Sequence, residues 1–175
     1  MTPAGTRSAR VDEVVAEGRR LLEEEGPEAL TMRRLADRLG IRAPSLYKHL
    51  PGKAALEAAI IATGLEESAA AFEAAVGGAS DPLPALAAAY RGFALAHPHL
   101  YRLMHDGPLP RRHLPPGLED RAAAPILRVA GGRARARALW AFAHGMVMLE
   151  LDHRFPPDAD LDAAWQAGVA AFQPA

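Results

Sequence analysis

Basic side chains gather between Thr31 and Lys53, and they are the residues of this sequence best suited to chemistry with an anion. The basic residues of this segment are Arg33, Arg34, Arg38, Arg42, Lys48 and Lys53, and its one acidic residue is Asp37. The local formal charge is therefore six minus one, or +5, although the whole chain carries only −1. A cationic stripe within a nearly neutral chain favours an anionic partner such as nucleic acid.

Catalytic and metal-binding chemistry has less support in the residue pattern. His97, His99, His105 and His113 are close in sequence, but they lack the His-x-x-x-His spacing of a helical zinc site. The chain contains no Cys, which excludes disulfides, thiolate metal sites and a Cys nucleophile. No Ser-His-Asp order, glycine-rich phosphate loop or carboxylate pair stands out. We therefore expect no catalytic residue, no cofactor and no metal.

The elements that position the basic stripe are predicted to be three short helices. The first spans about residues 8–25 and ends at Gly26-Pro27. The second spans 32–39, with Thr31 as N-cap and Gly40 in the left-handed region after it. The third begins near Ala43, has Pro44 in its first turn and ends by Pro51-Gly52. Two short helices joined by a glycine-containing turn outline a helix-turn-helix. Its predicted small core is Leu35, Leu39, Ile41 and Leu46.

Helical spacing continues along the rest of the chain, and strand-like alternation is nearly absent. The remaining predicted helices span about residues 53–76, 82–96, 98–104, 118–130, 133–151 and 159–172. Four prolines between Asp106 and Gly117 predict a mobile loop. We expect an all-α protein of nine helices. Residues 1–53 are predicted to form a helix-turn-helix domain, and residues 54–175 a helical regulatory and dimerisation domain.

Three motifs within Thr31–Leu56 carry a family resemblance. They are Leu35-Ala-x-x-Leu39-Gly-Ile, Pro44-Ser-Leu-Tyr-x-His49 and Gly52-Lys-x-x-Leu56. Together they resemble the DNA-binding domain of the tetracycline-repressor (TetR) family over roughly the first 60 residues. The resemblance implies a bacterial transcription regulator that binds palindromic double-stranded operator DNA as a homodimer.

The third helix is then expected to enter the major groove as a recognition helix. Arg42 is suited to guanine, Ser45 to a base or phosphate, and Ala43 and Pro44 to apolar contact such as a thymine methyl. The predicted DNA-contacting residues are Thr31, Arg33, Arg42, Ala43, Pro44, Ser45, Tyr47, Lys48, His49 and Lys53. Tyr47, His49 and Lys53 are interpreted as phosphate ligands, although Tyr47 could instead cap the small core. Arg34 and Arg38 are interpreted as solvated charges.

A second resemblance lies in Leu139-Trp140-Ala-Phe-Ala-His144-Gly145 and in His97-Pro-x-Leu-Tyr101-x-Leu-Met104. These segments resemble the C-terminal domain of the Trp-His-Gly (WHG) subgroup of the same family. The resemblance implies that the last two helices form a four-helix bundle with a second subunit, and Gly145 would allow close approach there. The predicted interface residues are Phe142, Met146, Leu149, Trp165, Val169 and Phe172.

The other C-terminal helices are expected to enclose a pocket for a small-molecule effector, because the resemblance implies ligand control of the two DNA heads. The candidate lining residues are Phe72, Tyr90, Phe93, Tyr101, Met104, Trp140 and His144. Their apolar and aromatic character predicts a largely apolar effector. Each of them could instead belong to an ordinary packed core, since aromatic and Met residues at helical spacing commonly do.

The remaining expectations concern location and the alternatives. The N-terminus lacks a signal-peptide core, and no apolar run approaches the roughly 18 residues of a membrane span. We therefore expect a soluble cytoplasmic protein without a membrane partner. A repressor released by its effector is the main prediction. An activator or a ligand-insensitive DNA binder remains open. So does a small helical enzyme or ligand carrier with a vestigial DNA head.

Overall fold

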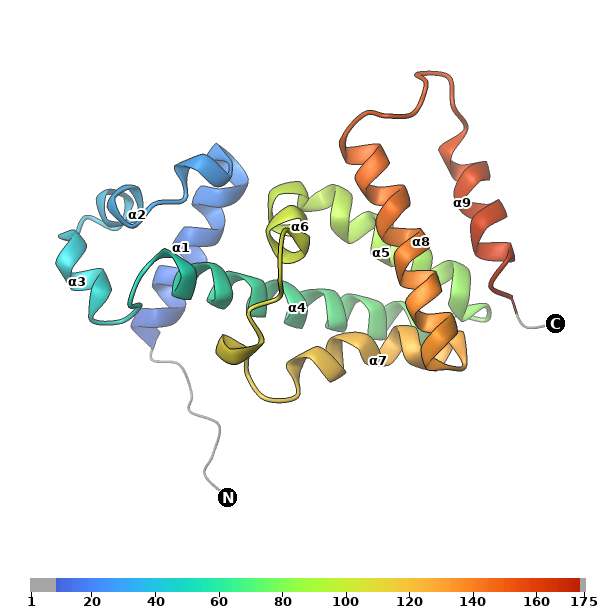
Figure 1. The fold of residues 1–175 in the computed structure, drawn as a ribbon, viewed down its shortest axis with the longest axis horizontal. Helices are drawn as coiled ribbons and strands as arrows, with labels where there is room; N and C mark the ends of the chain where they lie inside the picture. The colour runs from blue at the N-terminus through green and yellow to red at the C-terminus, as the bar shows by residue number, and fades with distance from the viewer. Residues whose placement is uncertain (1–8, 174–175) are drawn as a thin grey trace. The chain divides into compact units, whose positions relative to one another are not determined.

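The computed structural model describes residues 9–173 of the chain (Figure 1). Within that range the chain forms nine α-helices, two short 3₁₀ turns and no β-strand, which confirms the predicted all-α fold class. No helix formed by these residues combines the length and apolar character that crossing a bilayer requires. Ser8, where the first helix was expected to begin, lies outside the described residues.

The first helices agree with the predicted helix-turn-helix. They are α1 (Ala9–Glu25), η1 (Pro27–Ala29), α2 (Met32–Arg38) and α3 (Ala43–Tyr47). Gly40 has a φ of 64°, so the turn between α2 and α3 uses the left-handed conformation that glycine permits. The helix α3 ends at Tyr47 with Lys48 as its C-cap, before the predicted limit at Pro51-Gly52.

The remaining helices also follow the predicted order. They are α4 (Lys53–Gly77), α5 (Pro82–Ala96), α6 (Pro98–His105), α7 (Leu118–Ala130), α8 (Arg133–Leu151) and α9 (Leu161–Ala170). The helix α9 is shorter than the expected 159–172. Its start is set by Asp160, whose side chain accepts a hydrogen bond from Ala163 N at 2.9 Å. The predicted loop before α7 contains a short 3₁₀ turn, η2 (Arg111–His113).

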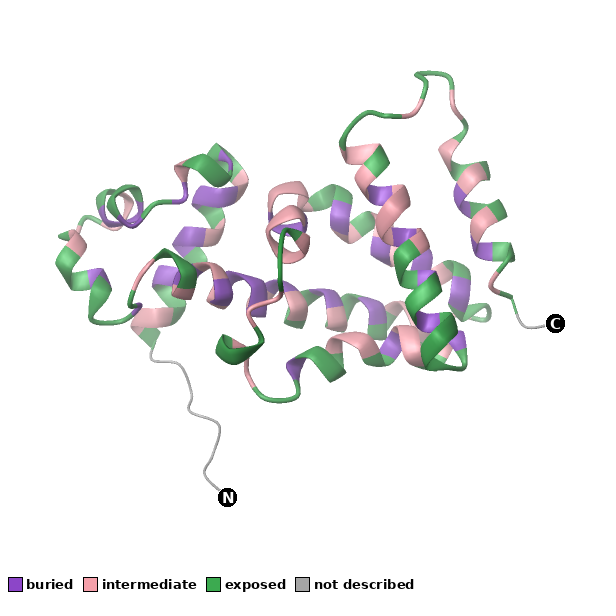
Figure 2. Ribbon diagram, viewed as in Figure 1, coloured by how far each residue is buried: buried purple, intermediate pink, exposed green. Residues whose placement is uncertain are grey.

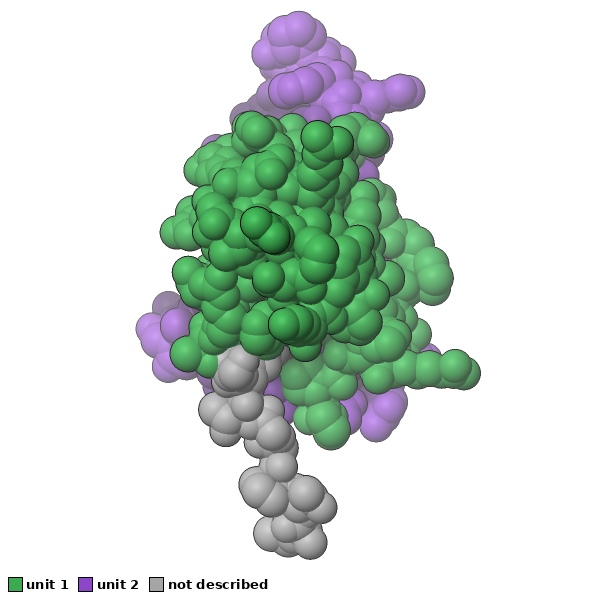
Figure 3. Space-filling view, turned by 90° about the vertical axis from the view of Figure 1, so that its left-hand side faces the viewer, with its two compact units in different colours: residues 1–65, 97–118 green, residues 66–96, 119–175 purple. Residues whose placement is uncertain are grey.

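The chain divides into two compact units, which Figure 3 shows in different colours. Unit 1 holds the chain up to Leu65 together with His97–Leu118, and unit 2 holds Glu66–Ala96 together with Glu119 onward. The first division therefore falls inside α4, and α6 belongs to the unit of the helix-turn-helix. The predicted boundary after residue 53 separates a DNA-binding part from a regulatory part, whereas the two units are defined by packing. That boundary stays a prediction.

In unit 1, α1 packs against α2 and α6, and α2 packs against α3. Leu35 and Leu46, two of the predicted core residues, are fully buried, whereas Leu39 and Ile41 are only partly buried. Figure 2 shows how buried and exposed residues alternate along the helices. Gly64 of α4 lies directly against α6, since a Cβ atom there would be 2.6 Å from Met104 Sδ. The helix-turn-helix of unit 1, called the head below, therefore has a small core to which several helices contribute side chains.

In unit 2, α5 packs against α8 and α9, and α8 and α9 lie side by side (Figure 1). The buried side chains of these helices are Leu83, Leu86, Tyr90, Leu139, Val147, Trp165 and Val169. Gly168 of α9 lies directly under the Phe142 ring of α8, and a Cβ atom at Gly168 would clash with that ring. The absence of a side chain at Gly168 therefore sets how closely α9 approaches α8.

We expect Gly168→Ala to lower the free energy of unfolding by about 1–3 kcal/mol, because the added methyl group overpacks the Phe142 ring. Gly92→Ala is the matched control, since Gly92 lies inside α5 with no atom within 4 Å of an added Cβ. The control should be neutral or stabilising, because Ala favours a helix interior over Gly. Thermal or urea unfolding measures both variants, and equal stability of the two would contradict this packing.

Candidate nucleic-acid interface

The helix α3 presents most of its residues to solvent and is held by one apolar anchor. Leu46 is fully buried, whereas Arg42, Ser45, Tyr47 and Lys48 are exposed. Tyr47 is 53% exposed, which argues against the alternative that its ring caps the small core. Pro44 occupies the first turn as predicted, where its missing N–H leaves no hydrogen bond unmade.

The residues that flank α3 reach solvent as well. The Thr31 hydroxyl accepts a hydrogen bond from Arg34 N at 3.1 Å, which confirms Thr31 as the N-cap of α2. Arg33 and His49 are exposed, and Ala43 is partly exposed. Lys53 begins α4, and its Nζ lies 3.6 Å from Glu57 Oε1. All ten predicted DNA-contacting residues thus lie in unit 1 with at least part of their surface open, and their contact with DNA stays a prediction.

A network of ion pairs joins the C-terminal part of α1 to α2. We call it the α1–α2 network, and it consists of Glu17, Glu24, Glu25, Arg34 and Arg38. Arg38 faces three carboxylates at once, through Nε to Glu17 at 2.6 Å, Nη2 to Glu24 at 2.7 Å and Nη1 to Glu25 at 3.0 Å. Arg34 donates two hydrogen bonds to Glu25, at 3.1 Å from Nε and 3.0 Å from Nη2.

The pKa directions follow from these hydrogen bonds. The bonds from Arg34 lower the pKa of the Glu25 carboxyl, and the same bonds raise the pKa of Arg34. The hydrogen bond to Glu24 raises the pKa of Arg38. Glu24 and Glu25 end α1, where the helix dipole disfavours negative charge, so both arginines offset an unfavourable acidic terminus.

Both arginines were interpreted as solvated charges; Arg34 is 52% exposed and Arg38 24% exposed, and both are in addition ion-paired. The acidic residues Glu23, Glu24 and Glu25 lie just before the basic stripe and were the available signal, but sequence spacing did not show which residues pair. Within residues 9–173, Arg33, Arg42 and Lys48 are the cations of the stripe that have no acidic partner. The charge offered to an anion is consequently concentrated around α3 and the exposed side of α2.

The histidines of the 97–113 region lie in unit 1, and two of them, His97 and His105, make contacts with named partners. His97 Nδ1 lies 3.9 Å from Glu23 Oε1, and Glu23 also accepts a hydrogen bond from Leu100 N at 3.3 Å. His105 Nδ1 lies 2.8 Å from Tyr101 O, and the two rings stack with centroids 4.2 Å apart. In the described part of the chain, no three His, Asp or Glu side chains gather as a metal site would require.

The predicted pocket residues are divided between the two units. Tyr101 and Met104 belong to unit 1, and Phe72, Tyr90, Phe93, Trp140 and His144 belong to unit 2. In unit 2 the Phe72 ring stacks on Tyr90 at 5.5 Å and meets Phe93 edge-on at 6.3 Å. These three rings fill space as a packed aromatic core. The seven residues therefore do not form one set around a single cavity within either unit.

Unit 2 does contain a small apolar cavity between α5, α7 and α8. It measures about 10 Å³ and is lined by Leu86, Ala87, Tyr90, Ile126, Leu139, Trp140 and Ala143. That volume suits about one water molecule, whereas pockets for drug-sized ligands measure roughly 300–1,000 Å³. Tyr90 and Trp140 are the predicted pocket residues that line it. His144 lies one helical turn after Trp140, and burial lowers the pKa of its imidazole.

The predicted dimer residues fall into two groups. Trp165 and Val169 are buried within their own chain, and the Phe142 ring packs between Trp165 at 5.6 Å and Phe172 at 5.9 Å. Met146 is partly exposed. By contrast, Leu149 is 43% exposed. Gly145, one turn before it, has no atom within 4 Å of an added Cβ, so this face of α8 is open within a single chain.

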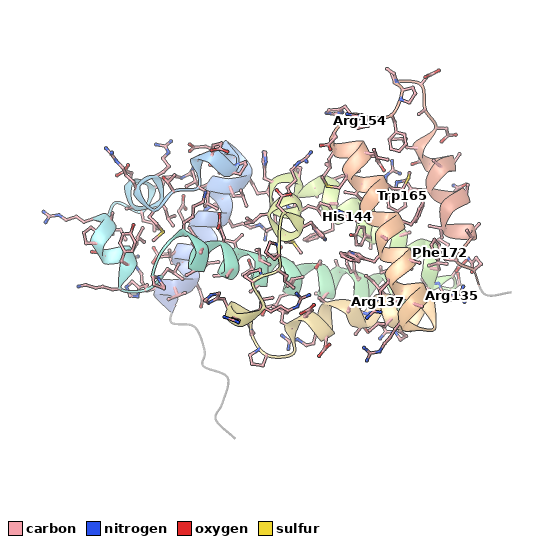
Figure 4. All side chains as sticks on the ribbon, viewed as in Figure 1. Arg135, Arg137, His144, Arg154, Trp165 and Phe172 are labelled. Atoms are coloured by element: carbon pink, nitrogen blue, oxygen red, sulfur yellow. The ribbon has the colours of Figure 1, made fainter. Side chains whose placement is uncertain are left out.

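A buried polar cluster that the sequence did not reveal ties α5, α8 and α9 together. The Glu150 side chain is only 6% exposed, and its Oε2 accepts hydrogen bonds from Arg91 Nη2 at 2.9 Å and Nε at 3.0 Å. Its Oε1 accepts from Trp165 Nε1 at 2.5 Å, and Arg91 also contacts Asp162 at 2.5 Å. Burial works to lower the pKa of Arg91, but the hydrogen bonds to Asp162 and Glu150 outweigh it and raise the pKa. Figure 4 shows Trp165 on α9.

Comparison with known proteins finds family matches for both the N-terminal and the C-terminal part of the chain. Residues 14–60 match the bacterial regulatory proteins of the tetR family, and residues 83–172 match a tetracyclin repressor-like C-terminal domain. An uncharacterized HTH-type transcriptional regulator of Mycobacterium tuberculosis, Rv0681, is 31% identical over 155 residues, which are 82% of this chain and 71% of the relative. The chain spans about half the length, 51%, of three further mycobacterial HTH-type regulators, with which it shares 29% identity.

Solved structures share the fold along nearly the whole chain. A protein of unknown function from Rhodococcus sp. RHA1 is 26% identical with a TM-score of 0.77, and the match covers 97% of this chain and 95% of that one. A single-substitution variant of TetR from Acinetobacter baumannii AYE, crystallised in complex with minocycline, is 24% identical with a TM-score of 0.66 over 92% of each chain. The second likeness shows the fold alone.

We expect Glu150→Gln to lower the free energy of unfolding by about 1–3 kcal/mol, because it keeps an acceptor for Trp165 but removes the charge that Arg91 faces. Asp158→Asn is the matched control, since it removes one carboxylate from the exposed segment before α9. Chemical unfolding monitored by Trp fluorescence measures both. A Glu150 variant as stable as the control would show that this cluster does not hold the three helices.

Proposed function

Because this chain belongs to the tetR family of bacterial regulatory proteins, we propose that it is a transcriptional regulator that represses its target by binding operator DNA as a homodimer. The observation that carries the proposal is the exposed surface of α3. Arg42, Tyr47 and Lys48 project from this short helix, and Leu46 anchors it. An anionic duplex is the partner that this combination of cations, hydroxyls and a solvent-facing ring fits best.

In the proposed complex α3 lies in the major groove with its first residues at the base edges. Arg42 has no acidic partner within residues 9–173, so its guanidinium is available for the O6 and N7 atoms of a guanine. Ser45 lies one turn further on and is suited to a base or a phosphate. Tyr47, His49 and Lys53, with Thr31 and Arg33 from α2, contact the flanking phosphates. Phosphates fix the register, and the bases provide the specificity.

The proposed dimer uses the open face of α8. Ala138, Ala141 and Gly145 are small residues there, and Leu149 adds a large exposed apolar side chain. Small residues permit close helix approach, and a two-fold axis places the same face of both copies in contact. Phe142, Trp165, Val169 and Phe172 support the interface from behind by fixing α9 on α8. Two heads then read half-sites about 34–36 Å apart.

Release by an effector is the regulatory part of the proposal. The cavity between α5, α7 and α8 is entirely apolar in its lining, which fits a largely apolar small molecule. At about 10 Å³ it must widen to accept one, and Trp140 is the most exposed of its lining residues. The minocycline complex of the Acinetobacter baumannii protein is an instance of a small molecule bound to this fold. A coupling of about 1–3 kcal/mol between effector and DNA is enough for control.

Two alternatives keep the DNA-binding head and differ in regulation. An activator and a ligand-insensitive DNA binder would have the same α3 surface, because the sign of regulation depends on where the operator lies. A small helical enzyme or ligand carrier with a vestigial head is a separate class. The exposed and unpaired Arg42 and Lys48 favour a working head over a vestigial one.

We expect Arg42→Ala to weaken binding to the DNA upstream of the chain's own gene by about 1–3 kcal/mol, because the bidentate guanine contact is lost. Tyr47→Ala should weaken it through a lost phosphate contact, with Tyr47→Phe separating the hydroxyl from the ring. Arg154→Ala, which removes an equal charge outside the head, is the control. Gel-shift titrations measure all four, and undiminished binding by both Ala variants of the head would refute the docking.

We expect Leu149→Glu to weaken the dimer on the order of tenfold to a hundredfold, because the interface would then bury a charge without a partner. Leu95→Glu is the matched control, since Leu95 on α5 is 42% exposed and lies outside the proposed interface. Sedimentation equilibrium across a concentration series measures the dissociation constants. Equal effects of the two variants would place the subunit contact elsewhere.

A further inference from the structure

The α1–α2 network treats its two arginines differently. Arg38 is 24% exposed and faces three carboxylates, so it is fixed between the helices. Arg34 is 52% exposed and has Glu25 as its acidic partner. Arg34 also stands beside Arg33 and three residues after Thr31, both of which the proposed function places against DNA. The Arg34 guanidinium is therefore the more exposed of the pair and the one that could exchange its carboxylate for another anion.

The contact between Arg34 and Glu25 has the geometry of a phosphate contact. Two nitrogens of the guanidinium, Nε and Nη2, each donate to a different oxygen of one carboxylate, at 3.1 and 3.0 Å. A guanidinium pairs with two phosphate oxygens through the same planar fork. While Glu25 occupies the Nε and Nη2 edge of Arg34, a DNA phosphate cannot use that edge, and the neutralised guanidinium attracts a phosphate less strongly.

On this basis, and resting on the proposed function, we propose that Glu25 restrains DNA binding by occupying Arg34 as an internal substitute for phosphate. The Glu25 carboxylate neutralises the Arg34 guanidinium, so that Arg34 adds little to the cationic surface seen by a duplex. Arg33, Arg42 and Lys48 carry most of the phosphate attraction instead. Loss of the Glu25 charge frees one further phosphate ligand on the same face.

The test is the salt dependence of binding to a labelled duplex of mixed sequence, because phosphate contacts do not depend on base sequence. We expect Glu25→Gln to bind more tightly than the unmodified chain and to steepen the slope of log K against log salt by about 0.9. Its advantage should therefore shrink about 3.5-fold between about 50 and 200 mM salt.

Two variants separate this effect from a general change in charge. Glu24→Gln removes the same unit charge from the same helix end but leaves the Arg34–Glu25 pair intact, so its slope should match that of the unmodified chain. The double variant Arg34→Gln/Glu25→Gln restores the net charge without the arginine, and it too should match the unmodified chain. Circular dichroism before each titration confirms that the helices are retained.

Each outcome supports or overturns a stated proposal. Equal slopes for Glu25→Gln and Glu24→Gln overturn the proposal, because Arg34 then does not reach phosphate. A double variant whose slope is shallower than that of the unmodified chain by about 0.9 also overturns it, because Arg34 then binds phosphate in the presence of Glu25. Absence of duplex binding by every variant overturns the proposed function and this inference together, whereas the first two outcomes overturn the inference alone.

Discussion

The burial of Leu46 is the interaction on which the rest of the head depends. The helix α3 spans only Ala43–Tyr47, and a helix of that length is not stable in water by its own hydrogen bonds. Its conformation is fixed because Leu46 is fully buried where α3 packs against α2, with the left-handed turn at Gly40 setting the path between the two helices. Once that anchor is in place, the helical period directs Arg42, Ser45 and Lys48 to solvent. The same apolar contact that stabilises the fold therefore creates the polar surface.

The second unit holds three helices together through large aromatic side chains and one close helix approach. Gly168 lets the Phe142 ring lie against α9, and the same ring contacts Trp165. Buried charge then fixes the register, because Arg91, Glu150 and Trp165 satisfy one another only when α5, α8 and α9 are correctly aligned. What remains open is one face of α8 and a cavity too small for a ligand. These two features are the ones that the proposed dimer and the proposed effector site would use.

The basic residues of the stripe have two different roles. Arg38 and Arg34 hold α2 to the acidic end of α1, whereas Arg33, Arg42 and Lys48 face solvent without acidic partners among residues 9–173. A local charge of +5 thus overstates what a duplex meets. The chain can be nearly neutral overall and still have a basic segment. The glutamates that neutralise part of this segment lie close to it in sequence. Affinity for an anion is set by which pairs form, and net charge alone does not report it.

The sequence by itself determined the helices, their order and the identity of the head. Proline, glycine and the Thr31 cap act locally, and Leu46 and Leu35 follow from helical period, so these features need no knowledge of distant residues. The motifs around Tyr47 and His49 likewise indicated the family through short-range spacing. Only the tertiary structure decided which charges pair, which aromatic rings fill the core and which glycine lies under a ring. Arg91 and Glu150 are 59 residues apart, and Phe142 meets Gly168 from another helix. Such contacts depend on helix packing angles, which are set by many side chains together and leave no periodic signal along the chain.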